Sequence, residues 1–257
     1  MQDTRPSLLI YHVDHAAIVA QVMEMVGPIR IVVVEDSADI ISPHTTFDHL
    51  LASEPQSTWV PTAHHDPAMI LYTSGSTGKP KGAVHSHSAA YHGIDISRQV
   101  FDLCPESRVL VGKPISHAGG LETQLVPALL AGGQVTLAVN RTAAEALAAT
   151  LSYGITEDAM LASDLLDFVE YLETNPIDLP SLRTTVGSGD SVPVSLHERF
   201  RDLFGWEVLE ACGMTEIGGD YSANSVHGKR KWGSLGLPAP ETELRVVDEL
   251  GGMSPWS

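Results

Sequence analysis

Residues 108–151 read RVLVGKPISHAGGLETQLVPALLAGGQVTLAVNRTAAEALAATL, and the order of apolar runs in this stretch decides the fold class. The short runs 108–111 and 135–139 are rich in valine, which is typical of strands. Each run is followed by a longer segment of helical character, 121–130 and 143–151. Strand, helix and strand in succession predict a right-handed crossover between parallel strands.

The same alternation continues along most of the chain. The β-branched run 29–34 favours a strand buried on both faces, and Asp14 is expected to cap a helix that ends at Gly27. Residues 53–67 contain three prolines and predict a long surface loop. The other predicted strands cover 8–11, 68–72, 183–186, 207–209 and 243–247, with one more near Ala159, and the other predicted helices cover 14–26, 86–101, 164–172 and 194–204. Together they predict an α/β fold with mostly parallel sheets flanked by helices.

Composition excludes several classes of protein. The 257 residues are 43% hydrophobic and 18% charged, which fits one large globular domain or two smaller ones. A net charge of −17 argues against binding to duplex nucleic acid or to an anionic membrane surface. The two cysteines, Cys104 and Cys212, lie too far apart for a zinc knuckle or a disulfide scaffold, so a reducing, cytoplasmic setting is expected. Pro127 and nearby glycines interrupt the longest apolar stretch, so no membrane span is expected.

The loop after the predicted strand 68–72 is the richest in chemistry. Residues 73–82 read TSGSTGKPKG, where glycines permit tight turns, hydroxyls donate hydrogen bonds and two lysines supply positive charge. This combination predicts a cradle for a polyphosphate. It is not a Walker loop, because Thr73 and Pro80 stand where that motif requires glycine and a hydroxyl residue. A flexible surface turn is the alternative.

The few lysines and one acidic segment support this interpretation. In a strongly acidic chain the mean field repels ATP, so local cations are needed, and Lys113 also follows a strand end. Lys229 and Lys231 form a second basic cluster, for which scattered solvated lysines stay an alternative. The segment 210–216 reads EACGMTE and is expected to be a loop whose hydroxyl and carboxylate can hold a phosphate oxygen and Mg²⁺. For His85 and His87, which flank Ser86, a helix start is a simpler explanation than a metal pair.

Four segments occur in an order that resembles one enzyme family. These are YTSGSTGKPKG (72–82), GSGDSVP (187–193), ACGMTE (211–216) and GSLGLP (233–238). They are similar to the AMP-forming, acyl-adenylate-forming enzymes, which include acyl-CoA synthetases, luciferases and peptide-synthetase adenylation domains. The resemblance implies part of the large N-terminal domain of such an enzyme, with 1–67 ending a first subdomain, 68–257 forming the nucleotide-binding core, and the small C-terminal domain absent.

The resemblance also implies roles for individual residues. Lys79, Thr215, Glu216 and His117 would act in catalysis, with Glu216 as the Mg²⁺ ligand and His117 beside the reacting carboxylate; a histidine satisfied by loop backbone is the alternative for His117. Cys212 stands where the family usually has an aromatic residue on the adenine. The residues implied in binding ATP are Thr73, Ser74, Gly75, Ser76, Thr77, Gly78, Lys81, Gly187, Ser188, Gly189, Glu210, Ala211, Cys212, Gly213 and Met214.

The implied reaction is ATP-dependent formation of an acyl-adenylate with release of pyrophosphate, followed by thioester formation with coenzyme A. The segment 117–120 leans toward fatty or small aliphatic acids by resemblance. The family's ribose aspartate and late lysine are not found after Gly252. We therefore expect a core truncated at both ends with weak or no activity, and the alternative is an inactive nucleotide-binding remnant or interaction module.

Overall fold

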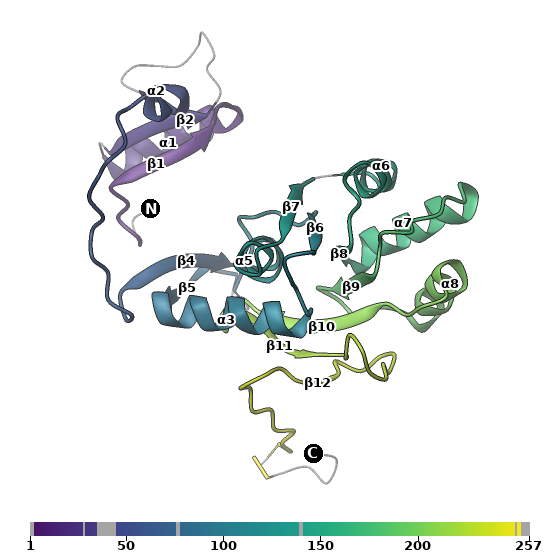
Figure 1. The fold of residues 1–257 in the computed structure, drawn as a ribbon. Coiled ribbons are helices and arrows are strands. Elements are labelled where there is room, and N and C mark those ends of the chain that lie inside the picture. The colour runs from purple at the N-terminus through teal and green to yellow at the C-terminus, as the bar shows by residue number, and fades with distance from the viewer. Residues whose placement is uncertain are drawn as a thin grey trace. The chain divides into compact units, whose positions relative to one another are not determined.

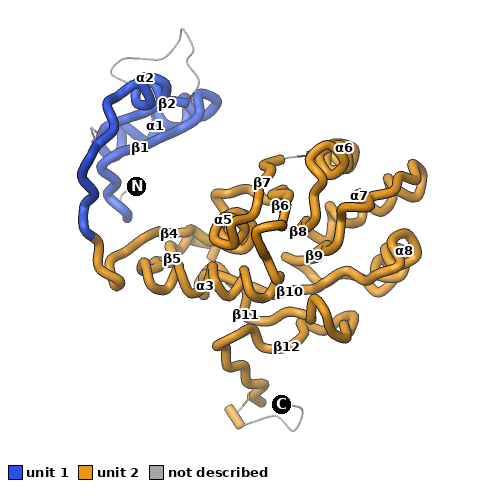
Figure 2. The backbone as a smooth tube through the Cα atoms, viewed as in Figure 1, with its two compact units in different colours: residues 1–61 blue, residues 62–257 orange. Residues whose placement is uncertain are grey.

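The computed structural model describes residues 3–27, 29–34, 45–75, 78–138, 141–249 and 251–252. It divides into two compact units, residues 1–61 and 62–257 (Figure 2). Within the described residues, no helix combines the length and the apolar composition that are needed to cross a bilayer.

The smaller unit is a three-stranded parallel sheet with helices. Strand β2 (Arg30–Val34) pairs with β1 (Leu8–His12) and with β3 (Thr45–Thr46). The 3-10 turn η1 (Val13–His15) and helix α1 (Ala16–Val26) connect β1 to β2, and helix α2 (Phe47–Leu51) follows β3. The core consists of Tyr11, Val19, Ile31 and Val33. The predicted strands and first helix are confirmed, but Asp14 lies inside η1 instead of capping α1, because the chain makes a tighter turn before the helix begins.

The larger unit is built on a seven-stranded sheet with the order β12-β11-β10-β9-β8-β6-β7 (Figure 1). Strands β7, β6, β8, β9 and β10 are parallel, whereas β11 and β12 are antiparallel additions at one edge. The strands are β6 (Arg108–Val111), β7 (Gln134–Leu137), β8 (Glu157–Leu161), β9 (Thr184–Ser188), β10 (Leu209–Met214), β11 (Gly219–Ala223) and β12 (Leu237–Pro238). The α/β class predicted from residues 108–151 is confirmed.

Helices cover both faces of this sheet. Leu110 of β6 packs in a core with helices α6, α7 and α8, whereas its neighbours Val109 and Val111 pack in a second core with Phe101 and Ala128. Because successive side chains of a strand point to opposite faces, the two cores lie on opposite sides of the sheet. The helices are α3 (His87–Val100), α4 (Ala118–Gly120), the π-helix η2 (Leu121–Leu125), α5 (Val126–Leu130), α6 (Ala143–Tyr153), α7 (Ala162–Thr174) and α8 (Val194–Phe204).

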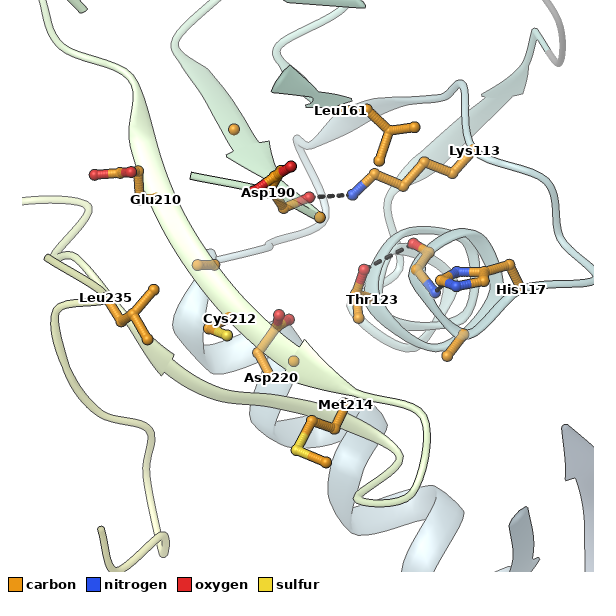
Figure 3. A pocket seen from close by; sticks show the side chains of 18 of the residues that line it. Lys113, His117, Thr123, Leu161, Asp190, Glu210, Cys212, Met214, Asp220 and Leu235 are labelled. Atoms are coloured by element: carbon orange, nitrogen blue, oxygen red, sulfur yellow. Dashed lines mark hydrogen bonds between the residues drawn. The ribbon is translucent and has the colours of Figure 1, made fainter. Parts of the chain in front are cut away.

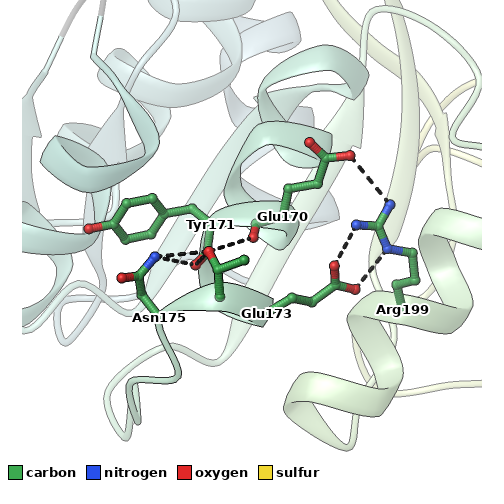
Figure 4. Close-up of polar contacts among 6 residues, drawn as sticks. Glu170, Tyr171, Glu173, Asn175 and Arg199 are labelled. Atoms are coloured by element: carbon green, nitrogen blue, oxygen red, sulfur yellow. Dashed lines mark hydrogen bonds and ion pairs between the residues drawn. The ribbon is translucent and has the colours of Figure 1, made fainter.

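Apolar contacts, more than charges, hold α7 against α8. Arg199 of α8 lies 2.6 Å from Glu173 and 3.8 Å from Glu170, both on α7 (Figure 4). These side chains are solvent-exposed, and exposed ion pairs contribute little to stability. Beneath them, the rings of Phe168 and Phe204 stack at 6.4 Å between centroids, so aromatic burial dominates this contact.

A hairpin replaces the expected passage from strand to helix at residues 67–87. Strand β4 (Pro67–Thr73) pairs in antiparallel register with β5 (Lys81–Ser86), and helix α3 then begins with Ser86 as its N-cap. Strand β5 was not predicted, whereas residues 74, 75 and 78–80 form no helix or strand, as predicted for the loop, and α3 lies where a helix was predicted. The strand was not predicted because Gly82 and the buried His85 interrupt the usual alternation of apolar and polar residues. In β5 the apolar Val84 is exposed and the polar His85 is buried.

Three other predictions need correction. The predicted strand 207–209 lies further along as β10, and β11 and β12 were not predicted. Residues 243–247 form no regular strand; Leu244, Val246 and Val247 are exposed and lack the burial that stabilises one. The surface loop is confirmed, since residues 53–66 contain no helix or strand and are all exposed.

Candidate functional site

A cavity of about 590 Å³ lies where the parallel strands β9 and β10 end (Figure 3). In open α/β sheets the loops that follow the carboxyl ends of the strands form the ligand sites. Here the segment after β6, the ends of β9 and β10 and the start of β11 supply the wall, and Leu161, Met214 and Leu235 add apolar surface. The cavity is large enough for a small organic ligand.

The cavity brings together three of the predicted segments. Its lining contains His117, Gly187, Ser188, Gly189, Glu210, Ala211, Cys212, Gly213, Met214 and Thr215. The segment 210–214 was expected to be a loop, but it is strand β10, and only the turn after Met214 matches that expectation. The pairing of β10 with β11 extends the strand, because Cys212 and Met214 find partners in Ser222 and Gly219.

The other predicted residues lie outside the lining of this cavity. They are Thr73, Ser74, Gly75, Gly78, Lys79, Lys81 and Glu216, whereas Ser76 and Thr77 fall outside the described residues. Gly75 and Gly78 both have positive φ, and a methyl group on Gly75 would lie 2.2 Å from the carbonyl oxygen of Lys79. Only glycine fits at position 75, and the side chains of Lys79 and Lys81 are exposed.

A buried histidine connects the hairpin to the turn after β10. Nε2 of His85, on β5, lies 2.8 Å from the carbonyl oxygen of Thr215. The side chain is almost fully buried, and the predicted helix start is confirmed, since Ser86 is the N-cap of α3. The strand that follows the glycine-rich loop and the cavity residue Thr215 are therefore in direct contact.

His117 has one ring nitrogen free to face the cavity. The amide of Gly119 donates a hydrogen bond of 2.9 Å to Nδ1 of His117, which caps the short helix α4. In the neutral ring the proton is then on Nε2. The backbone contact of the alternative interpretation is present, but the ring also lines the cavity, so the two interpretations are compatible.

Two buried charges on the cavity wall were not predicted as site residues. Lys113 donates a hydrogen bond to Oγ of Ser188; burial lowers its pKa, and the negative charges of Asp220, Asp158 and Asp164 oppose that shift. Burial raises the pKa of Asp220 to about 6, although Lys113 and a hydrogen bond from Ser97 favour its ionised form. The sequence identified Lys113 only as a cation after a strand.

The carboxylate of Glu210 ties two loops together beside the cavity. Its Oε1 accepts a hydrogen bond from the amide of Val192 at 3.3 Å, and Oε2 accepts one from the amide of Gly233 at 3.1 Å. Nε2 of His197 lies 3.4 Å from Oε2, and burial lowers the pKa of that histidine, against the attraction of Glu210. Glu210 therefore holds the loops after β9 and before β12.

A family model described as AMP-binding enzyme matches residues 1–255. The chain belongs to the AMP-binding enzyme family. The resemblance stated from four motifs is thereby confirmed.

Curated relatives of this family member are CoA ligases. A feruloyl-CoA synthase of a Streptomyces species is 32% identical over 78% of this chain and 41% of its own length. An indoleacetate–CoA ligase of Aromatoleum aromaticum is 33% identical over 72% of this chain and 36% of its own length. This AMP-binding chain thus spans about two-fifths of the length of those proteins.

Solved structures show the same fold. A crystal structure of an anthranilate CoA ligase in complex with anthranoyl-AMP has a TM-score of 0.88 and 22% identity, and covers 98% of this chain and 49% of that one. A benzoate CoA ligase from Burkholderia xenovorans has a TM-score of 0.82 and 24% identity. The match covers 99% of this chain and 50% of that one. The fold is that of the N-terminal domain of adenylate-forming enzymes.

Glu216, next to the cavity residue Thr215, is the carboxylate to which the sequence assigned a divalent cation. Among the described residues no group of three or more histidine, cysteine or acidic side chains could hold a metal ion. The exposed Glu216 follows Thr215 directly, and Mg²⁺ commonly binds one carboxylate together with substrate phosphates. The donor chemistry of Glu216 therefore fits Mg²⁺ that arrives with a nucleotide.

Proposed function

We propose that this chain takes part in activating a carboxylic acid with ATP, forming an acyl-adenylate and pyrophosphate, and then a thioester with coenzyme A. The observation that carries the proposal is the cavity, which gathers His117, 187–189 and 210–215 at the ends of parallel strands. The CoA ligases among its relatives support the same reaction class.

The chain's own residues would act mainly by positioning and by charge. Thr73, Ser74, Gly75, Ser76, Thr77 and Gly78, with Lys79 and Lys81, would bind the β- and γ-phosphates, so that negative charge moving onto pyrophosphate meets preorganised donors. Thr215 would contact the nucleotide phosphate, residues 187–189 would lie along the adenine, and Nε2–H of His117 would face the reacting carboxylate. Mg²⁺ held by Glu216 would neutralise phosphate charge. No protein nucleophile is needed, because alignment of two bound reactants supplies much of the rate.

The acid is proposed to be aromatic or short and polar. The relatives include ligases named for ferulate, indoleacetate, benzoate, malonate and sulfoacetate. The cavity offers apolar walls together with the ammonium of Lys113, which suits a ring or a short chain that carries a hydrogen-bond acceptor. None of these names supports the prediction of a fatty acid that was made from segment 117–120.

Nucleotide binding and pyrophosphate exchange test this proposal. The chain is titrated with ATP, AMP and adenosine, and is then assayed for incorporation of labelled pyrophosphate into ATP with benzoate, ferulate, malonate and octanoate. Lys79→Met should weaken the binding of ATP more than that of AMP, while the exposed control Lys229→Met should change neither affinity. Binding without exchange would favour the nucleotide-binding remnant, and absence of all binding would contradict both.

A further inference from the structure

A fully buried carboxylate lies behind the cavity without a hydrogen-bond partner in the described part of the chain. Glu122 is on the π-helix η2 and is 0% exposed, and neither Oε1 nor Oε2 is hydrogen-bonded there. A buried acceptor left unsatisfied costs about 1–3 kcal/mol, more for a charged group. Such a group is retained for a reason, and π-helical turns are frequent at functional sites.

The nearest titratable group is His85, whose orientation is fixed by Thr215. A backbone carbonyl only accepts hydrogen bonds, so the 2.8 Å contact with Thr215 means that Nε2 of His85 carries a proton. Nδ1 therefore points away from Thr215. Its protonation depends on what lies on that other side.

Gly218 shows that Glu122 lies on the Nδ1 side. A methyl group on Gly218 would be 2.9 Å from Nδ1 of His85 and 3.6 Å from Oε1 of Glu122, so the two atoms flank the same point. Gly218 has a φ of +82°, and the absence of a side chain keeps this space open. Nδ1 and Oε1 are therefore no further apart than the sum of these two distances, and because neither carboxylate oxygen is hydrogen-bonded directly among the described residues, one bridging water is the connection that fits.

Other charged groups packed around η2 already have partners. Asp95 on α3 pairs with Arg98 at 2.7 Å, and Asp220 on β11 accepts a hydrogen bond from Ser97. Burial raises the pKa of Glu122, and His85 is the charged group that lowers it. Of these groups, His85 is therefore the one that remains to act on Glu122.

We propose that Glu122 is a positioning residue that acts through His85. Glu122 binds Nδ1 through one bridging water, which holds the ring so that Nε2–H keeps the carbonyl of Thr215 in place. The inference rests on the proposed function, because Thr215 is the residue that would meet the nucleotide phosphate. Glu122 itself touches no ligand.

The test uses the whole chain with Glu122→Leu and the near-isosteric Glu122→Gln, and with Thr150→Val as a control for loss of a buried polar group on α6. Two-bond ¹H–¹⁵N spectra report the protonation of both ring nitrogens of His85. AMP and adenosine are titrated in parallel, because only AMP carries the phosphate.

In the unsubstituted chain we expect a protonated Nε2 and a hydrogen-bonded Nδ1. Glu122→Leu should shift the Nδ1 signal to that of a free, unprotonated nitrogen and weaken AMP about tenfold, the size of one hydrogen bond, with adenosine unchanged. Glu122→Gln, which should fold even if the leucine variant does not, should alter Nδ1 in the same direction with a smaller loss of AMP binding. Thr150→Val should leave both readouts unchanged.

Other results overturn the inference in distinguishable ways. Unchanged His85 signals in both Glu122 variants would show that the pair does not exist. Equal weakening of AMP and adenosine would mean a merely structural role. If the unsubstituted chain binds no AMP, the proposed function fails and the positioning role fails with it, while the spectra still show whether Glu122 acts on Nδ1 of His85.

Discussion

At the scale of single residues, Lys113 and Asp220 place opposite charges on one cavity wall. Both are buried, and neither makes an ion pair within 4 Å that the described residues record. Desolvation therefore dominates both groups, lowering the pKa of Lys113 and raising that of Asp220 to about 6. Each can change charge more readily than an exposed lysine or aspartate.

The raised pKa of Asp220 makes stability depend on pH. The native carboxyl holds its proton more tightly than the unfolded chain, where its pKa is 3.8, so its contribution to stability is lost as the pH rises from about 4 to about 6. Asp220→Asn keeps an acceptor for Ser97 and removes this loss. In urea unfolding, the free energy of unfolding of the variant minus that of the unsubstituted chain should rise by up to about 3 kcal/mol between pH 3.5 and pH 7.5. The exposed Asp202→Asn is the control, and a gain independent of pH would contradict the assignment.

Lys113 should tune the titration of Asp220. Its positive charge lowers the pKa of Asp220, so Lys113→Met, which keeps the length of the side chain, should raise the pH range over which Asp220 costs the folded chain stability. The measurement compares urea unfolding of Lys113→Met with that of Lys113→Met combined with Asp220→Asn across the same pH range. No change in the pH range of that cost would mean that the ammonium does not act on Asp220.

At the scale of elements, the sequence predicts the parallel core better than the antiparallel additions. Strand β6 has a strong apolar run because it is buried on both faces, and this run is visible without a structure. Strand β5 contains Gly82 and a buried histidine, and β11 contains the buried Asp220, so their burial depends on partners distant in sequence. The residues of β10 at the cavity were named from the sequence, whereas Lys113, Glu122 and His85 were not assigned their contacts, since tertiary packing alone supplies them.

Helix α3 approaches the turn before β11 so closely that only glycine fits at the contact. A methyl group on Gly93 would lie 2.0 Å from the carbonyl oxygen of Gly218. Helix propensity alone would make Gly93→Ala stabilising by about 1 kcal/mol. The overlap should reverse the sign and destabilise the chain by about 1–3 kcal/mol, the usual range for overpacking. Urea unfolding tests this, with the exposed His92→Ala on the same helix as control, and a stabilised Gly93→Ala would contradict the close approach.

The start of α6 is fixed by a capping box. Thr142 accepts a hydrogen bond from the amide of Glu145, and the carboxylate of Glu145 accepts one from the amide of Thr142 at 2.8 Å. Thr142→Ala should lower the free energy of unfolding by about 1 kcal/mol, while Thr142→Ser should keep most of the cap. Equal stability of the two variants in urea would show that the cap is not formed in solution.

At the scale of the whole molecule, the two compact units differ in how much core they possess. Among the described residues, the smaller unit has one cluster of four buried apolar residues, whereas the larger unit has two larger clusters on opposite faces of one sheet. Small units bury a smaller share of their surface and are correspondingly marginal. The cavity lies wholly within the larger unit.

Limited proteolysis should therefore separate the units while sparing the cavity. Residues 51–68 are all exposed, and Trp59 is 92% exposed, which makes it an accessible site for chymotrypsin. We expect early cleavage at Trp59 and a resistant large product that keeps the AMP affinity of the intact chain, measured by mass spectrometry and calorimetry. Trp59→Ser should slow that first cut without changing AMP affinity. First cleavage inside residues 108–214, or loss of AMP binding when the chain is cut at Trp59, would show that the larger unit depends on residues 1–59 for its stability or its site.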